Sequence, residues 1–363
     1  MEIHGYEMRA AGEALHRGAR PCEGPGPDQV LIEVAGCGVC HTDLGLLYDG
    51  VPTRHALPLV LGHEVSGVVV GEGAGVTGWK GASVIVPAVL PCGKCEVCLR
   101  GRGAICRSQV FPGNDDHGGF ATHVVVPAHG LCRVPGDAAA RDRLARLSVV
   151  ADAVSTPYQA IRNSEVDSGD FVVFVGAGGV GSFGVQIARA LGARVLAIDV
   201  DDDRLALVRE HGAEWTINGR ELSTKDLRKK VRDLAKGEKL PASEWKIFET
   251  SGTRGGQETA FALLTHGAVL GVVGYHPGDV SVRLSNLMAF AARAEGTWGC
   301  LPGLYPEILD LVLSDKVRID PFVEEHPMSA INTIFERLRR HELKKRPILV
   351  PDFAGAGNHA AEE

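Results

Sequence analysis

Four cysteines lie close enough together in the sequence to hold a metal ion. Cys92, Cys95, Cys98 and Cys106 fall within PCGKCEVCLRGRGAIC, with the spacing C-x2-C-x2-C-x7-C. Four thiolates at such short separations are typical of a closed tetrahedral zinc site, which stabilises a fold and leaves no position open for chemistry. We therefore predict a structural zinc ion in this segment.

A second set of metal-binding residue types lies upstream, in the motifs GCGVCHTD and GHE. Zinc prefers thiolate and imidazole ligands, and a catalytic zinc takes three protein ligands with one position open. Cys40 and His63 supply two ligands, although Cys37 competes with Cys40. Glu64 either binds the metal or lies just behind it. We choose Asp152 as the third ligand, and a carboxylate makes the metal harder than a second thiolate would.

A glycine-rich turn follows the apolar run FVVFV and opens a helical pattern. Its spacing is G-x-G-x-x-G, which allows a tight turn, a close approach of the backbone to a pyrophosphate, and packing of the helix on the strand. The helix N-terminus then offers N–H groups to the phosphates. The residues predicted to bind a dinucleotide here are Gly176, Gly178, Gly179, Val180 and Gly181.

Asp199 ends the next apolar strand, at the spacing expected for a carboxylate that binds the ribose of the cofactor. Such a carboxylate accepts hydrogen bonds from both ribose hydroxyls and repels a 2′-phosphate, so it favours NAD over NADP. Arg204 is placed to stack on the adenine, with an ordinary surface arginine as the alternative.

The bulk of the sequence limits the possible classes of protein. A chain of 363 residues with 45% hydrophobic content is long enough for about two domains. The net charge of -7 argues against general nucleic-acid binding. The N-terminal segment lacks the pattern of a signal peptide, and no apolar run approaches the roughly 20 residues that span a bilayer. We expect a cytoplasmic enzyme with no membrane or nucleic-acid partner.

The pattern of apolar residues changes along the chain. Short Val- and Ile-rich runs predict a β-rich, antiparallel or barrel-like domain over residues 1–152. From 153 to 301, apolar strands alternate with helical patterns, which predicts a parallel sheet covered by helices. Residues 302–363 carry one amphipathic helix, YPEILDLVLSDK, and are expected to return to the first domain. We expect the tail AGAGNHAAEE to be disordered, and the basic run LRKKVRDLAKGEK to be a solvated helix face rather than an anion site.

Taken together, these motifs resemble those of the zinc-dependent medium-chain dehydrogenase/reductase family, the alcohol dehydrogenase superfamily. The resemblance implies an α/β protein with a GroES-like catalytic domain and a Rossmann domain. It also implies that Cys40, not Cys37, binds the catalytic zinc. Thr42 then matches the hydroxyl of a proton relay, and His41 matches the residue that passes the proton outward. Asp152 stands where the family normally has a cysteine.

Several stretches resemble one branch of this family, among them GYEMRAAGE, VIVPAVLPCGKC and FPGNDDHGGFATHVVVPAHGLC. That branch oxidises the ring hydroxyl of 6-hydroxycyclohex-1-ene-1-carbonyl-CoA in the anaerobic degradation of aromatic compounds. The resemblance thus implies a CoA thioester substrate, NAD, one catalytic and one structural zinc, and a homodimer or homotetramer. The alternatives are a zinc dehydrogenase of another secondary alcohol or polyol, and a zinc-containing reductase of an activated enoyl-CoA.

Overall fold

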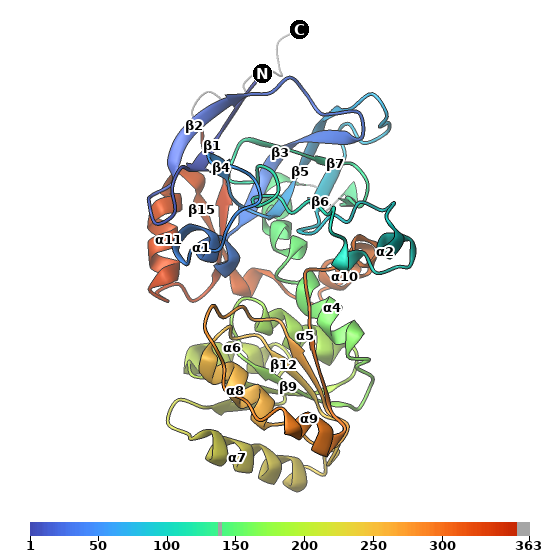
Figure 1. The fold of residues 1–363 in the computed structure, drawn as a ribbon, viewed down its shortest axis with the longest axis vertical. Coiled ribbons are helices and arrows are strands. Elements are labelled where there is room, and N and C mark those ends of the chain that lie inside the picture. The colour runs from blue at the N-terminus through green and yellow to red at the C-terminus, as the bar shows by residue number, and fades with distance from the viewer. Residues whose placement is uncertain (137–139, 354–363) are drawn as a thin grey trace. The chain divides into compact units, whose positions relative to one another are not determined.

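The computed structural model describes residues 1–136 and 140–353. The chain divides into two compact units, and Figure 1 labels many of their elements. Unit 1 comprises Met1–Asp152, Cys300–Leu309 and Ile319–Glu363, and unit 2 comprises Ala153–Gly299 and Asp310–Arg318. The predicted disordered tail, AGAGNHAAEE, lies outside the described residues. Within the described ranges, no helix is both long enough and apolar enough to cross a membrane.

Unit 1 contains two β-sheets, as the Val- and Ile-rich runs predict. The larger sheet has the order β15-β16-β3-β5-β6-β8, with β7 paired to β3, and the smaller has the order β2-β1-β4. Pairing is antiparallel except between β15 and β16. The strands are β1 (Glu2–Met8), β2 (His16–Pro21), β3 (Gln29–Gly38), β4 (Leu59–Val60), β5 (Glu64–Glu72), β6 (Ser83–Val86), β7 (His123–Pro127), β8 (Cys132–Arg133), β15 (Val323–Pro327) and β16 (Arg346–Val350).

The helices of unit 1 are short and lie between these strands. They are α1 (His41–Tyr48), α2 (Glu96–Leu99), α3 (Arg141–Arg146) and α11 (Ile331–Arg339). The 3-10 turns are η1 (Gly103–Ile105), η3 (Leu147–Ala151), η4 (Pro302–Leu304), η5 (Asp320–Phe322) and η6 (Met328–Ala330). Helix α11 corrects the prediction of a single helix after residue 302. Its apolar residues Ile331, Ile334, Phe335 and Leu338 recur at helical spacing and are all buried.

Unit 2 is a parallel sheet with helices packed against it, as the alternation of strands and helices predicts. Its strand order is β11-β10-β9-β12-β13-β14, and every pair is parallel. Helix α5 contacts β9 and β10, and α8 contacts β9 and β12. The elements are α4 (Ser155–Asn163), β9 (Phe171–Val175), α5 (Gly181–Ala190), β10 (Arg194–Asp199), α6 (Asp202–Glu210), β11 (Trp215–Asn218), α7 (Thr224–Gly237), β12 (Lys246–Glu249), α8 (Arg254–Ala262), β13 (Val269–Val272), α9 (Ser285–Phe290) and β14 (Arg293–Gly296).

The C-terminal segment is divided between the two units. Helix α10 (Tyr305–Leu313) begins in unit 1, whereas residues 310–318 group with unit 2. The apolar pattern of the sequence predicts instead that all of 302–363 returns to the first domain. The side chain of Gln186 explains part of the difference, because it accepts a hydrogen bond from the Arg318 N–H at 2.8 Å and donates to the Arg318 carbonyl at 3.2 Å. These bonds attach residue 318 to helix α5.

The core of unit 1 depends on α11. The Phe335 ring is fully buried and meets the Phe120 ring edge-on, with 5.7 Å between the ring centroids. We predict that Phe335→Ala lowers the free energy of unfolding by about 3–5 kcal/mol, because buried apolar contacts are lost and the surrounding residues fill the cavity only in part. Urea unfolding measures this change. The control Leu99→Ala removes an exposed side chain and should change the free energy by less than about 0.5 kcal/mol.

Candidate active site and metal centres

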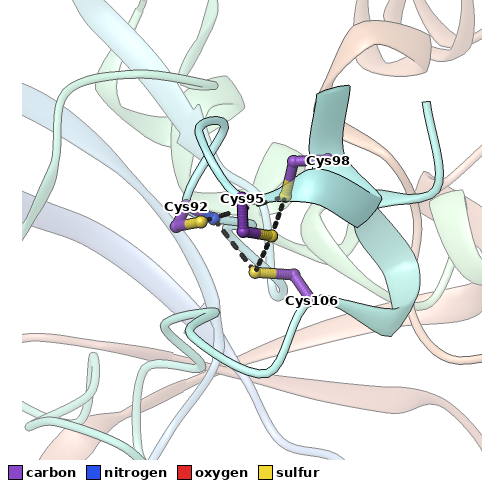
Figure 2. Close-up of side chains that lie close together, drawn as sticks. All are labelled: Cys92, Cys95, Cys98 and Cys106. Atoms are coloured by element: carbon purple, nitrogen blue, oxygen red, sulfur yellow. Dashed lines mark hydrogen bonds between the residues drawn. The ribbon is translucent and has the colours of Figure 1, made fainter. Parts of the chain in front are cut away.

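The four clustered cysteines converge around helix α2. Figure 2 shows their side chains turned toward one another. The Cys95 sulfur lies 3.4 Å from that of Cys98 and 3.7 Å from that of Cys106, and the Cys92 and Cys98 sulfurs are 4.0 Å apart. A tetrahedral zinc with Zn–S bonds of about 2.3 Å separates its sulfurs by about 3.8 Å. The donor set therefore fits the predicted structural zinc.

The thiols of this cluster differ in proton affinity. Backbone N–H groups of Lys94 and Cys95 lower the pKa of Cys92 to about 6. Desolvation, followed by the neighbouring Cys95 and Cys106, raises the pKa of Cys98 to about 12. At neutral pH the four sulfurs therefore do not all become thiolates by themselves. A divalent metal supplies the missing positive charge and releases the remaining protons.

The second cluster brings together Cys40, His63, Glu64 and Asp152, whose donor atoms all lie within 4.8 Å of one another. Cys40 is the residue before α1, His63 precedes β5, and Asp152 follows η3. One Asp152 carboxylate oxygen lies 3.7 Å from the Cys40 sulfur and 3.6 Å from His63 Nε2. Such separations suit ligands that share one tetrahedral ion, so these residues fit a catalytic zinc.

His63 is oriented by Asp43. His63 Nδ1 lies 3.4 Å from a carboxylate oxygen of Asp43, so that Nε2 points into the cluster. Asp43 is itself held by the backbone N–H groups of Cys40 and Gly62, at 2.9 and 3.2 Å. Burial opposes a charge on His63, but Asp43 and then Asp152 raise the pKa of His63 well above its ordinary value. The negative potential that attracts a proton to this imidazole also attracts a metal cation.

Glu64 is paired with Arg346. The guanidinium donates from Nε to one carboxylate oxygen at 2.8 Å and from Nη2 to the other at 2.5 Å, and both side chains are buried. Burial raises the pKa of Glu64 to about 7, against the opposing charge of Arg346. Because both oxygens accept from the guanidinium, the geometry favours Glu64 behind the metal over Glu64 as a ligand.

Two other residues flank this cluster. Cys37, the alternative to Cys40, is fully buried, and its thiol lies 3.7 Å from the Gly38 carbonyl, outside the group of donor atoms. Phe111 covers His63, with 4.9 Å between the two ring centroids. An aromatic side chain against the imidazole lowers the access of water to that side of the site.

The two predicted relay residues begin helix α1. The Thr42 hydroxyl lies 3.6 Å from the Cys40 sulfur, beside the cluster. His41 is exposed, and its ring is stacked against that of His341 with 6.2 Å between centroids. A hydroxyl next to the donor atoms and an imidazole at the surface, one residue apart, provide the two ends of a short proton path.

The glycine turn joins β9 to α5 in unit 2. Gly176 has a φ of +104°, and a Cβ there would lie 2.5 Å from the Ser251 nitrogen. A Cβ at Gly181 would lie 1.9 Å from the Gly176 carbonyl oxygen. At Gly178 a Cβ would meet only Nη1 of Arg204, at 3.7 Å. The first and last glycines are thus required by packing, whereas the middle one leaves its backbone open to a ligand.

Asp199 lies at the end of β10 and is hydrogen-bonded to this turn. One carboxylate oxygen accepts from the Ala177 N–H at 2.6 Å, and the other accepts from the Val200 and Asp201 N–H groups at 2.7 and 3.0 Å. Arg204, from α6, reaches the same turn. The turn, the acid and the arginine are therefore together at the carboxyl edge of the sheet, where dinucleotides bind in open α/β folds.

Comparison with known proteins assigns the chain to a family. The family profile of the alcohol dehydrogenase GroES-like domain matches residues 26–136, and that of the zinc-binding dehydrogenases matches residues 179–314. An alcohol dehydrogenase from Geobacillus stearothermophilus is 31% identical over 326 residues, covering 88% of this chain and 91% of that protein. The chain belongs to the zinc-dependent alcohol dehydrogenase family.

Solved structures of similar proteins agree with the fold of this dehydrogenase. The alcohol dehydrogenase of Aeropyrum pernix has a TM-score of 0.85 and 28% identity, covering 96% of this chain and 100% of that chain. The acetophenone reductase of Geotrichum candidum, solved in complex with NAD, has a TM-score of 0.82 and 27% identity and covers 98% of both chains. The predicted GroES-like and Rossmann fold class is confirmed, as is an oxidoreductase that acts on CH–OH groups.

Sequence reasoning missed three residues of the dehydrogenase site. Asp43 had a local signal, because it stands three residues after Cys40 in GCGVCHTD, where it accepts a hydrogen bond from the Cys40 N–H. Arg346 stands in the sequence as a single charged residue at the start of the apolar run RPILVPDF, and this position alone does not indicate a role in the site. Phe111 had no signal, because it follows the cysteine lobe in a segment without periodicity.

The structural zinc gives a direct prediction. Cys95→Ser removes the sulfur at the centre of the four-cysteine cluster. The measured zinc content should therefore fall from about two to about one ion per chain. The thermal midpoint should fall as well, because metal binding contributes to folding. The control is Cys132→Ser, a buried cysteine outside both clusters. Two zinc ions retained by Cys95→Ser at wild-type affinity would contradict the assignment.

Proposed function

We propose that this chain is an NAD-dependent zinc dehydrogenase of a secondary alcohol, with Cys40, His63 and Asp152 as the ligands of the catalytic zinc. The observation that carries the proposal is the convergence of one thiol, one imidazole and one carboxylate on a common point, next to a threonine hydroxyl. Three protein ligands leave a fourth position for the alcohol. Glu64 lies behind the zinc position and does not bind the metal, because Arg346 donates hydrogen bonds to both of its carboxylate oxygens.

When zinc is bound, it supplies the Lewis acidity that lowers the pKa of the substrate hydroxyl toward neutral pH. The residues of the chain then move the proton. Thr42 accepts it through a hydrogen bond, and His41 delivers it to solvent from the surface of unit 1. A histidine suits the outlet because its ordinary pKa lies near 6.5. Phe111, packed on His63, keeps water from the reacting centre.

NAD rather than NADP is the proposed acceptor of the hydride. Asp199 presents a carboxylate at the end of β10, beside the glycine turn, where it binds ribose hydroxyls and repels a 2′-phosphate. The similar acetophenone reductase of Geotrichum candidum was solved with NAD. Arg204, next to Gly178, is placed to stack on the adenine or to contact the phosphates.

The proposed substrate is 6-hydroxycyclohex-1-ene-1-carbonyl-CoA, whose ring hydroxyl becomes a ketone conjugated with the thioester. The support is the likeness of GYEMRAAGE, VIVPAVLPCGKC and FPGNDDHGGFATHVVVPAHGLC to that branch of the family. Another secondary alcohol is the second candidate, favoured by relatives named alcohol dehydrogenase and L-threonine 3-dehydrogenase, both at 30% identity.

A homodimer or homotetramer is proposed as the assembly, and the edge of the sheet in unit 2 supports it. Strand β14 is the last strand of its sheet and carries mostly exposed residues. Leu284, just before α9, is 68% exposed, and Met288, within α9, is 78% exposed. An open strand edge beside exposed apolar residues favours self-association. Light scattering of the purified chain should give a multiple of the 38.5 kDa monomer, and Met288→Glu should lower it.

The proton relay predicts a selective loss of turnover. Thr42→Ala should lower kcat by about 10²–10³-fold, because the hydroxyl that accepts the proton is removed. Zinc content and NAD affinity should remain at wild-type values, since Thr42 holds neither group. The matched control Thr42→Ser keeps the hydroxyl and should keep most of the activity. Unchanged turnover in Thr42→Ala would refute the relay.

The substrate assignment is tested by NADH formation. The purified, zinc-analysed protein is offered 6-hydroxycyclohex-1-ene-1-carbonyl-CoA, its free acid and a panel of plain secondary alcohols, each with NAD and with NADP. We expect turnover with the CoA ester and NAD only. Turnover with plain alcohols and none with the thioester would keep the zinc dehydrogenase and reject the CoA substrate.

A further inference from the structure

Phe111, whose ring covers His63, begins a tight turn of the chain over residues 111–115. The Phe111 carbonyl accepts hydrogen bonds from the N–H groups of Asn114 and Asp115, at 3.0 and 2.9 Å. One carboxylate oxygen of Asp115 in turn accepts from the Phe111 N–H at 2.9 Å. Both backbone polar groups of Phe111 are therefore bonded within the turn, and the Asp115 side chain fixes the backbone of the residue whose ring meets His63.

The same carboxylate attaches the turn to the segment that follows helix α1. Its second oxygen accepts from Arg54 Nη1 at 3.1 Å. The Arg54 N–H donates to the side-chain oxygen of Asn114 at 3.1 Å, and the His55 N–H donates to the Asn114 carbonyl at 2.8 Å. Helix α1 directly follows Cys40. Three hydrogen bonds thus join the turn to the part of the chain that carries this proposed ligand.

The turn also packs against the backbone that precedes His63. Gly113 has a φ of +81°, and a Cβ there would lie 2.7 Å from the Gly62 nitrogen. The N–H of Gly118 donates to the Val60 carbonyl at 2.7 Å, and a Cβ at Gly118 would lie 2.2 Å from the Gly62 carbonyl oxygen. Only glycine permits so close an approach at these two positions. The segment from 111 to 118 therefore rests directly on the residue before this ligand.

The ring of Phe111 reaches the third proposed ligand segment as well. Phe111 is buried in a small apolar cluster that includes Ala88. The Ala88 N–H donates to the Ala151 carbonyl at 3.2 Å, and Ala151 directly precedes Asp152. A single aromatic ring thus packs between the segment of His63 and the segment of Asp152, so its position affects two proposed ligands together.

General stability explains little of this arrangement around Asp115. The Asp115 side chain is 13% exposed, but that of Arg54 is 58% exposed, and an ion pair with one partner so exposed contributes little to stability. The backbone before the turn is held independently, because Val110 and Leu90 exchange two hydrogen bonds at 2.8 and 2.9 Å. Removal of the Asp115 carboxylate should therefore leave the fold intact and release mainly the turn that carries Phe111.

We propose that Asp115 is a positioning residue of the dehydrogenase, which holds the Phe111 ring against His63 and so fixes the imidazole for metal binding. The imidazole then has two constraints, Asp43 at Nδ1 and the Phe111 ring on its face. Residues that orient a metal ligand without touching the metal typically change metal affinity by about 10–100-fold when they are removed. This proposal rests on the proposed function, because it takes His63 as a zinc ligand.

Competition between the zinc-loaded full chain and a chelator of known affinity tests this role without any substrate. Asp115→Ala should lower the affinity of the more weakly held zinc by about tenfold or more, while the four-cysteine cluster keeps its ion as an internal reference. Asp115→Asn removes the same charge but keeps an oxygen for the Phe111 N–H, so its affinity should stay close to that of the wild type. The control Glu214→Ala removes an acid that pairs with Arg194 in unit 2, at 3.0 Å, and should change nothing.

A double-mutant cycle shows whether Asp115 acts through Phe111. Phe111→Ala should weaken the same zinc by a similar factor, and Asp115→Ala in that background should add little, because the ring that it holds is gone.

Three results would overturn the proposal: wild-type affinity in Asp115→Ala or in Phe111→Ala, equal losses in Asp115→Ala and Asp115→Asn, or losses that multiply in the double variant. A wild-type chain that holds only one zinc ion would instead reject the proposed function, and this inference with it.

Discussion

The candidate active site depends on negative charge that is buried around one imidazole. Asp43 and Glu64 are fully buried, and Asp152 and the Cys40 thiol complete the ring of acidic groups around His63. Arg346 compensates only one of these charges, because both of its hydrogen bonds go to Glu64. Several acidic groups brought together away from water repel one another, and a cation among them lowers that cost. A zinc ion held by the thiol, the imidazole and the Asp152 carboxylate would be such a cation.

The sheet of unit 1 assembles this site by its register. Gly38 of β3 lies opposite Glu64 of β5, and Ile348 of β16 lies opposite Gly38 on the other side. A Cβ at residue 38 would lie 2.0 Å from a Glu64 carboxylate oxygen, so only glycine leaves room for the buried pair with Arg346. Cys40 and His63 lie next to these register positions. The strand pairing thus places the proposed ligands, and the Glu64–Arg346 pair connects β5 to β16.

The parts of this structure that local pattern determines were predictable. The cysteine lobe spans a few residues, and its spacing alone implies a closed metal site. The glycine turn with Asp199 occupies one β–α–β unit, and its strands and helix were predicted from periodicity. Helix α11 carries the same kind of signal in INTIFERLR, whose apolar residues recur at helical spacing.

The parts that depend on distant pairing were not predictable. Arg346 is 282 residues from Glu64 in the sequence, and no local pattern connects them. The attachment of residues 310–318 to unit 2 rests on hydrogen bonds of Gln186 to Arg318, 132 residues apart.

The zinc content of Asp152 variants tests the centre of this interpretation most directly. If Asp152 is the third ligand, Asp152→Ala should retain the structural zinc and lose the catalytic one, giving about one ion per chain instead of about two. Asp152→Cys, which restores a ligand of the usual family type, should recover the second ion. Two tightly bound zinc ions in Asp152→Ala would contradict the assignment and would return Glu64 as the third ligand.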